Sequence, residues 1–358
     1  MTNSTMTIKV PGKLMIAGEY AILEAHQRSI VMAVDRFVYA TIKTSNETRI
    51  SLPKLNLENL PCEIEKAKIH ILTNDKRVNF VENAMNIGYR YIIEKGHPFT
   101  NFHLAINSEL DDESGLKYGL GSSAAVVTAV IKAILEKHSI TSSPTLLFKL
   151  AAIAHVQTQG SGSGADVAAS SFGGMVAYTS FQAEWLKEAI ENTTSITELV
   201  EQDWPYFSVK PVSLPADIHM LIGWTGNPAS TKEFIKKISV LKKQNQELYN
   251  QFINLSAEAV DIIIQGIEVG NSKQIFQGIA SNRRALSNLG KNAEADIETA
   301  LLKILSDIAV KNGGAGKLSG AGGGDCGIAL LPGRENLEQV LQEWEKAGIK
   351  VLSLGINN

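Results

Sequence analysis

Two glycines and two serines stand directly before an apolar run in the segment YGLGSSAA, Tyr118 to Ala125. The apolar run predicts a buried helix that begins after Gly121, with both serines at its N-terminus. Unpaired backbone N–H groups and the positive helix end make such an N-terminus an anion site. The hydroxyls of Ser122 and Ser123 could add donors to a phosphate or oxygen ligands to Mg²⁺. The alternative is a tight turn that Ser122 or Ser123 caps.

Two better-known phosphate loops do not fit the chain. The P-loop pattern fails, because Gly316-Lys317 is followed by Leu318 and not by serine or threonine. The dinucleotide pattern G-x-G-x-x-A is met from Gly119, but an acidic loop precedes it where a strand is needed. The acidic end of a second strand, expected about 20 residues on, is also absent. A nicotinamide-dependent oxidoreductase therefore remains only a distant alternative.

Glycine gathers at two further points. The segment PGKLMIAGEY, Pro11 to Tyr20, offers the cation of Lys13. We expect a strand over Thr7–Val10 that Pro11-Gly12 ends, with Lys13 on the following turn; an ordinary surface lysine is the alternative. The segment KLSGAGGGDCGIALL places a glycine cluster, Gly320–Gly324, between two expected strands. A loop with so little side chain is approached closely by a ligand or by another stretch of backbone.

In this order and at these separations, the three segments resemble the three motifs of the GHMP kinases. This superfamily comprises galactokinase, homoserine kinase, mevalonate kinase and phosphomevalonate kinase. Within it, GEYAILE in the first motif, Lys117-Tyr118 before the second, and GWTGNPAST, Gly223 to Thr231, are most similar to phosphomevalonate kinases. The resemblance spans nearly the whole chain, and three ordered motifs are far more specific than any one of them.

The resemblance implies the following roles. Lys13 would lie near the transferred phosphoryl group and the acceptor, and Asp166 in SGSGAD matches the catalytic aspartate. The ATP phosphates would be bound by Lys117, Gly119, Leu120, Gly121, Ser122, Ser123 and Ala124, with Mg²⁺ held by Ser122 or Ser123. The acceptor would be bound by Lys13, Glu19, Tyr20, Ser163, Ser230, Arg283, Ser319, Gly320, Ala321 and Gly322.

The chain departs from mevalonate kinases at one metal ligand. Those enzymes carry a glutamate at the position where this chain has His155, eleven residues before Asp166. The metal would then rest on serine, phosphates, waters and Asp166. A phosphomonoester acceptor is already largely ionised at pH 7, because its second pKa is near 6. Asp166 therefore remains open as a base, a metal ligand or an orienting group.

An acceptor with two negative charges needs more cations than Lys13. Besides Arg283, whose fork suits phosphate oxygens, the candidates are Lys117, Lys232 and Arg284. For the arginines, a solvated helix face is the alternative. Four further lysines are expected to face solvent: Lys236, Lys237, Lys242 and Lys243.

Charge and cysteine content exclude several classes. With 34 basic and 37 acidic residues the net charge is −3, and the absence of any block of five or more like charges argues against nucleic-acid or membrane-surface binding. Cys62 and Cys326 form no pair typical of zinc sites or disulfide frameworks, and two thiols suit a reducing compartment. Met1 to Val10 lacks the apolar core of a signal peptide. We expect a cytoplasmic protein, monomeric or homodimeric.

The 358 residues predict two domains, 1–205 and 206–358, of the α+β class. The resemblance implies an N-terminal ribosomal-protein-like β/α lobe, a C-terminal ferredoxin-like α/β sandwich and an active site between them. Periodicity predicts a helix over Val78–Lys95, and Glu184–Trp204 is polar enough for an insertion or a connection. Strands are further expected over Arg36–Thr44, Phe99–Ile106, Gly173–Thr179, Ile218–Trp224 and Ile349–Leu352, and helices over 122–138, 144–157, 231–289, 295–311 and Glu335–Lys346.

The function that the resemblance implies is transfer of the ATP γ-phosphoryl group to (R)-5-phosphomevalonate, with Mg²⁺ as cofactor. A mevalonate kinase is the nearest alternative. A silent member of the fold that only binds a nucleotide or sugar is the second, although Lys13, Asp166 and an intact GLGSSAA loop argue against it.

Overall fold

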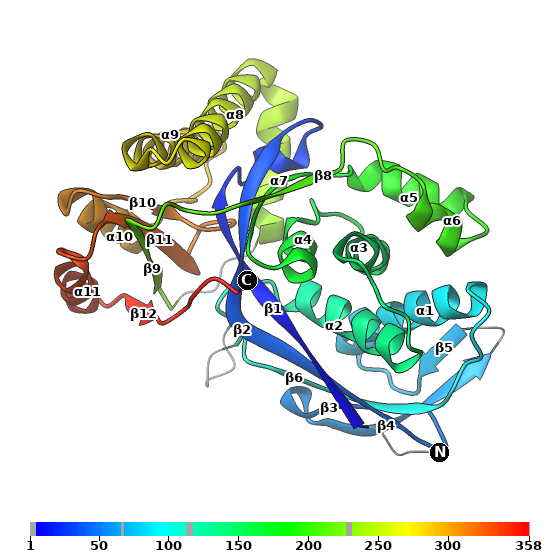
Figure 1. The fold of residues 1–358 in the computed structure, drawn as a ribbon. Coiled ribbons are helices and arrows are strands. Elements are labelled where there is room, and N and C mark those ends of the chain that lie inside the picture. The colour runs from blue at the N-terminus through cyan, green and yellow to red at the C-terminus, as the bar shows by residue number, and fades with distance from the viewer. Residues whose placement is uncertain (1–4, 66–67, 112–116, 227–230, 358) are drawn as a thin grey trace.

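The computed structural model describes residues 5–65, 68–111, 117–226 and 231–357, which form two β-sheets with helices packed against them (Figure 1). The larger sheet has eight strands in the order β5-β4-β3-β6-β2-β7-β8, with β1 paired to β2. Its strands are β1 Thr5–Ala17, β2 Arg28–Thr44, β3 Arg49–Leu52, β4 Leu57–Glu65, β5 Lys68–Ile71, β6 Phe102–Ser108, β7 Met175–Thr179 and β8 Ser208–Val212.

Apolar helices cover one face of the large sheet. The helix predicted over Val78–Lys95 is confirmed as α1, Asn79–Glu94, and its apolar stripe packs on the neighbouring helices and on β5. The almost wholly apolar α2 lies between β1, β2 and three other helices, as its composition requires. The helices of this part are α1, α2 Ser122–Lys137, α3 Pro144–Gln159, α4 Ala165–Phe172, α5 Ala183–Asn192 and α6 Ile196–Glu201, with 3₁₀ turns at Ala21–Leu23, Pro53–Leu55 and Lys76–Val78.

The smaller sheet has four antiparallel strands in the order β10-β11-β9-β12. Its strands are β9 Ile218–Trp224, β10 Ala315–Leu318, β11 Cys326–Pro332 and β12 Lys350–Leu352. The helices of this half are α7 Thr231–Gln244, α8 Gln246–Glu268, α9 Ser272–Asn292, α10 Ala300–Lys311 and α11 Leu337–Lys346. Helix α10 packs on β10 and β11, and α11 packs on β12. Two helix-covered sheets confirm the predicted α+β class with two lobes.

One local prediction was wrong. Strand β1 does not end at Pro11-Gly12 but continues to Ala17, with a register shift between Pro11 and Lys13, so Lys13 lies within the strand and not on a turn. Proline is tolerated there because a bulge relaxes the ladder. The segment Glu184–Trp204 is largely helical and contains most of α5 and all of α6.

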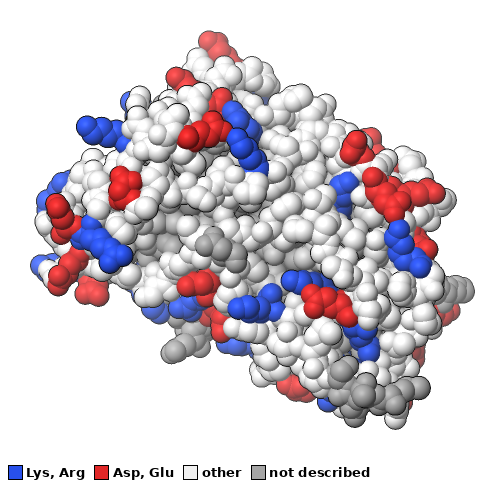
Figure 2. Space-filling view, viewed as in Figure 1, with Lys and Arg blue, Asp and Glu red and all other residues white. Residues whose placement is uncertain are grey.

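Strand β8 follows residue 205 in the chain but pairs with β7 in the large sheet. The division at residues 1–205 and 206–358 stays a prediction. Among the described residues, no helix is long and apolar enough to cross a membrane. Basic and acidic side chains are interspersed on the face that Figure 2 shows.

Candidate active site

The first glycine motif is pinned to the second through Lys13. Its backbone N–H donates to the carbonyl oxygen of Leu120 at 2.8 Å, and its Nζ donates to the carbonyl oxygen of Gly119 at 2.9 Å. A Cβ atom at Gly12 would lie 2.8 Å from the oxygen of Leu120, so only glycine lets the strand approach this closely. The bulge in β1 thus holds the Lys13 ammonium group beside the GLGSS loop.

Helix α2 begins at Ser122, and its N-cap residue is Gly121 in the left-handed conformation, with φ +74°. Among the described residues, no side chain caps this N-terminus, so the alternative of a tight turn capped by Ser122 or Ser123 is wrong. The first intrahelical bond runs from the N–H of Ala125 to the oxygen of Gly121 at 3.1 Å. The preceding N–H groups point out of the helix end, which is the arrangement that binds phosphate.

Asp166 stands in the first turn of α4, whose N-cap residue Gly164 is also left-handed, with φ +74°. Its Oδ1 accepts a hydrogen bond from the N–H of Val167 at 2.9 Å. A Cβ atom on Gly121 would lie 2.7 Å from Cγ of Lys13 and 3.4 Å from Cβ of Asp166. The structure therefore brings Lys13, Asp166 and the start of α2 together around Gly121.

The third glycine motif closes on the same place from the other sheet. The Ser319 hydroxyl donates to the carbonyl oxygen of Met15 at 2.8 Å, and the Tyr20 hydroxyl donates to that of Ala321 at 2.5 Å. A Cβ atom on Gly320 would lie 3.8 Å from Nζ of Lys13. The loop after β10 is thus a wall beside the Lys13 ammonium group.

Gly322 shows why this loop needs glycine. A Cβ atom there would lie 2.2 Å from the carbonyl oxygen of Ile297, and the backbone has φ +72°. The neighbouring Gly323 donates its N–H to the same oxygen at 2.7 Å. The close approach predicted for this cluster therefore includes an approach of backbone to backbone.

A buried ion pair joins the first and third motifs and was missed by sequence reasoning. Nζ of Lys317, in β10, lies 2.5 Å from Oε1 of Glu19. Both side chains are almost fully excluded from solvent, at 0% and 2% exposed. Burial lowers the pKa of Lys317, and the nearby Glu19 carboxylate opposes that change. The available signal was a lysine inside an otherwise apolar strand, which needs a partner when buried.

A cavity of about 330 Å³ opens beside these motifs. Two residues predicted to bind the acceptor, Tyr20 and Ser163, are part of its wall. Lys242 also lines it and pairs with Glu24 at 2.5 Å, and Tyr249 donates to the same carboxylate oxygen at 2.7 Å. The expectation that Lys242 simply faces solvent is therefore wrong, because its ammonium group links α7 to the turn that follows β1.

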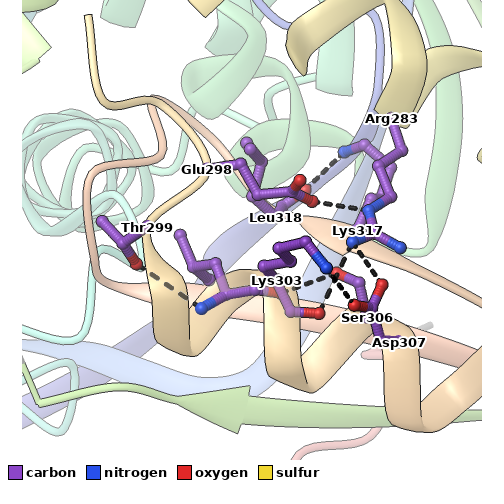
Figure 3. A network of polar contacts seen from close by, with 9 residues as sticks. Arg283, Glu298, Thr299, Lys303, Ser306, Asp307, Lys317 and Leu318 are labelled. Carbon is purple, nitrogen blue, oxygen red and sulfur yellow. Dashed lines mark hydrogen bonds and ion pairs between the residues drawn. The ribbon is translucent and has the colours of Figure 1, made fainter.

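Other predicted site residues lie elsewhere or remain outside the description. Arg283 pairs with Glu298 at 2.5 Å and with Asp307 at 2.7 Å, in the network of Figure 3, so two carboxylates already match its charge. Lys117 is exposed, and its backbone forms an isolated antiparallel β-bridge with the backbone of Asp111. Ser230 lies outside the described residues. The roles predicted for these residues stay predictions.

Two groups near the motifs remain protonated at neutral pH. Burial, with a smaller contribution from Glu19, raises the pKa of the Tyr20 phenol. Burial also raises the pKa of the Cys326 thiol to about 12. Tyr20 therefore acts as a hydrogen-bond donor, and Cys326 is a buried strand residue, as the sequence indicated, and not a nucleophile.

The described residues contain no group of three histidine, cysteine or acidic side chains that could hold a metal ion. Mg²⁺ does not require one, since it is usually bound by one or two protein oxygens together with waters and substrate phosphates. The candidate oxygen ligands are the hydroxyls of Ser122 and Ser123 at the start of α2 and the carboxylate of Asp166 in the first turn of α4. The Ser123 hydroxyl lies 3.3 Å from Nε2 of His155, which is buried. This donor set fits Mg²⁺ bound chiefly through nucleotide phosphates.

Known proteins share this arrangement. Residues 79–174 match the model of the GHMP kinases N terminal domain, and residues 267–350 match that of the GHMP kinases C terminal domain. A phosphomevalonate kinase of Streptomyces sp. is 30% identical over 99% of this chain and 98% of its own length. The chain belongs to the GHMP kinases.

Two solved structures resemble this GHMP kinase over nearly its full length. A protein from Listeria innocua has 36% identity and a TM-score of 0.93, covering 99% of this chain and 98% of its own. The Streptococcus pneumoniae phosphomevalonate kinase in complex with phosphomevalonate and AMPPNP has 29% identity and a TM-score of 0.85, covering 98% of this chain and 99% of its own. The family fold predicted from the three motifs is confirmed.

Proposed function

We propose that this GHMP kinase transfers the γ-phosphoryl group of ATP to (R)-5-phosphomevalonate, giving (R)-5-diphosphomevalonate and ADP. The observation that carries the proposal is the meeting of Lys13, Asp166 and the N-terminus of α2 around Gly121. The choice of acceptor is supported by the full-length phosphomevalonate kinase relative and by the solved complex with phosphomevalonate. In the reaction, the bond from the γ-phosphorus to the β,γ-bridging oxygen breaks, and a bond to an acceptor phosphate oxygen forms.

Binding of the ATP phosphates is assigned to the loop from Lys117 to Ala124. Its N–H groups at the start of α2 donate to phosphate oxygens, and no side chain among the described residues caps them. Gly119 and Gly121, with φ +79° and +74°, give the loop the turn that a residue with a side chain rarely adopts. This cradle fixes the γ-phosphoryl group for attack, and such positioning supplies much of the catalysis in phosphoryl transfer.

Lys13 supplies positive charge at the transferred group. Its ammonium group rests on the carbonyl oxygen of Gly119 at 2.9 Å and retains hydrogens for the migrating phosphoryl oxygens. Asp166 orients the acceptor, accepts its proton or holds metal; an acceptor phosphate is largely ionised at pH 7, so little deprotonation is needed. Ser122 or Ser123, together with Asp166, would hold Mg²⁺, which would neutralise phosphate charge when bound.

Acceptor binding is assigned to the loop after β10 and to the walls of the adjoining cavity. Tyr20 and Ser163 line this cavity, and the Tyr20 hydroxyl also donates to the carbonyl oxygen of Ala321 in the loop that follows β10. We further propose that the enzyme acts in the cytoplasm, as a monomer or a homodimer.

The test is Mg²⁺-dependent ADP release from ATP with phosphomevalonate and, separately, with mevalonate at matched concentrations. We expect turnover with phosphomevalonate alone. Turnover with mevalonate alone would contradict the acceptor assignment, and silence with both would contradict the proposed function. Lys13→Met should abolish most of the turnover, whereas Lys9→Met, on the same strand and exposed, should leave it unchanged.

A further inference from the structure

The ion pair of Lys317 and Glu19 joins the two sheets at the proposed site. Glu19 follows the end of β1 in the large sheet, and Lys317 belongs to β10 in the small one. Nζ of Lys317 donates to Oε1 of Glu19 and to the carbonyl oxygen of Leu318, both at 2.5 Å. Because the lysine side chain is 0% exposed, it has no direct access to a substrate.

Stability alone does not explain such a pair. Removing two charges from water costs several kcal/mol each, and replacing a buried pair with well-packed apolar side chains is often neutral or stabilising. Oε1 of Glu19 also accepts the N–H of Gly320 at 3.4 Å. The second carboxylate oxygen, Oε2, is buried and has no hydrogen-bond partner among the described residues. The orientation of this carboxylate is therefore set by Lys317 and by the loop after β10.

The loop after β10, whose Gly320 amide donates to the Glu19 carboxylate, lies beside Lys13. A Cβ atom on Gly320 would be 3.8 Å from Nζ of Lys13. The same loop is anchored on either side by the bonds from Ser319 to Met15 and from Tyr20 to Ala321. Rotation of the Glu19 carboxylate would release the Gly320 amide between these two anchors.

We propose that Lys317 is a positioning residue: through the Glu19 carboxylate it holds the Gly320 amide, and with it the wall beside Lys13, in the arrangement that phosphoryl transfer needs. The inference rests on the proposed kinase function. In this role Lys317 makes no contact with ATP or with the acceptor. The role explains why a lysine occupies a fully buried position of a strand in the small sheet.

The first test compares Lys317→Met with Lys303→Met. Lys303 is the matched control, because it pairs with Asp307 on the surface of α10 in the same part of the molecule (Figure 3). The assay is run well below the temperature at which either variant unfolds, and the rate is divided by the concentration of protein that binds ATP. Under these conditions kcat of Lys317→Met should fall by about 10- to 100-fold, the loss typical of an ångström-scale misplacement. KM for ATP should stay within about twofold, since α2 builds the phosphate cradle. A kcat equal to that of Lys303→Met would overturn the proposal.

The second test asks whether Lys317 acts through Glu19. In the Glu19→Gln background no lone buried carboxylate remains, so the double variant should fold even if Lys317→Met does not. Adding Lys317→Met to Glu19→Gln should change kcat by less than about twofold, because the two residues act as one unit. A further tenfold loss would show that Lys317 acts independently of Glu19 and would overturn the proposal.

The third test needs no activity. Amide exchange of residues 319–325 in the free protein should be faster in Lys317→Met than in wild type and in Lys303→Met, because the Gly320 amide loses its oriented acceptor. Unchanged exchange would overturn the positioning role. Wild type without turnover on phosphomevalonate would refute the proposed function instead, and the exchange measurement would still decide this inference.

Discussion

Substitution of Gly121 by alanine tests whether the first and second motifs form one catalytic unit. Gly121 has φ +74°, and a Cβ atom there would lie 2.7 Å from Cγ of Lys13. Gly160, which caps α3 with φ +76°, has nothing within 4 Å of the same position. Gly160→Ala is therefore a matched control that shares the backbone cost without the contact.

The structure distinguishes the cost of the left-handed backbone, which both variants share, from the cost of the contact with Lys13, which only Gly121→Ala has. Alanine in a left-handed conformation costs about 1–2 kcal/mol, so both variants should lose that much unfolding free energy. At Gly121, Cγ of Lys13 must in addition retreat by 3.4 − 2.7 = 0.7 Å to reach ordinary van der Waals contact. This atom lies near the backbone of a strand, so the ammonium group moves with it. A shift of about 1 Å in catalytic geometry can cost about 10²-fold, and we expect kcat to fall by about 10- to 100-fold.

The assay measures urea unfolding and ADP release for both variants under the same conditions. We expect Gly121→Ala to lose at least as much unfolding free energy as Gly160→Ala, and kcat to fall in Gly121→Ala alone. If Gly121→Ala and Gly160→Ala had the same kcat, the contact between Gly121 and Lys13 would have no catalytic consequence, and the unit inferred here would be refuted.

Two further predictions concern Asp166 and Cys326. Asp166→Asn should lower kcat or raise the Mg²⁺ concentration needed for half-maximal rate; full kcat at unchanged Mg²⁺ dependence would remove its role as base and as metal ligand. For Cys326, the folded pKa of about 12 exceeds the usual unfolded value near 8.5, so the unfolded chain loses the proton first as pH rises. Wild type should therefore lose about 2 kcal/mol more unfolding free energy than Cys326→Ala between pH 8 and pH 10, in urea titrations. Equal losses would show that the thiol is not buried.

Local sequence patterns predicted individual elements well where the spacing of apolar residues and the residues at the element's ends indicate the same boundaries. The apolar stripe over Val78–Lys95 forms α1. Helix α3 begins at Pro144, directly after its N-cap residue Ser143. Strand β9 spans the predicted Ile218–Trp224. The helices depend on hydrogen bonds within one segment, so nearby residues suffice to specify them, whereas β9 was recognised as an apolar run because it lies between β11 and β12.

Elements whose form depends on distant partners were not predicted as well. Strand β1 crosses Pro11-Gly12 because β2 pairs with it on both sides of the bulge. The polar segment after β7 folds as α5 and α6, which pack against α3. At Pro11-Gly12, tertiary contacts overrode a local signal that indicated the end of a strand.

The sequence by itself indicated the chemistry of this protein: three glycine motifs in order, with Lys13 on the first and Asp166 in the separate segment SGSGAD. Only the tertiary structure decided which charges meet. It buried Lys317 against Glu19 across 298 residues of chain and matched Arg283 with Glu298 and Asp307. The physical reason is that motif spacing reflects short-range backbone geometry, whereas the pairing of charges depends on how separate elements are packed: the two sheets for Lys317 and Glu19, and α9 with the segment from Glu298 into α10 for Arg283.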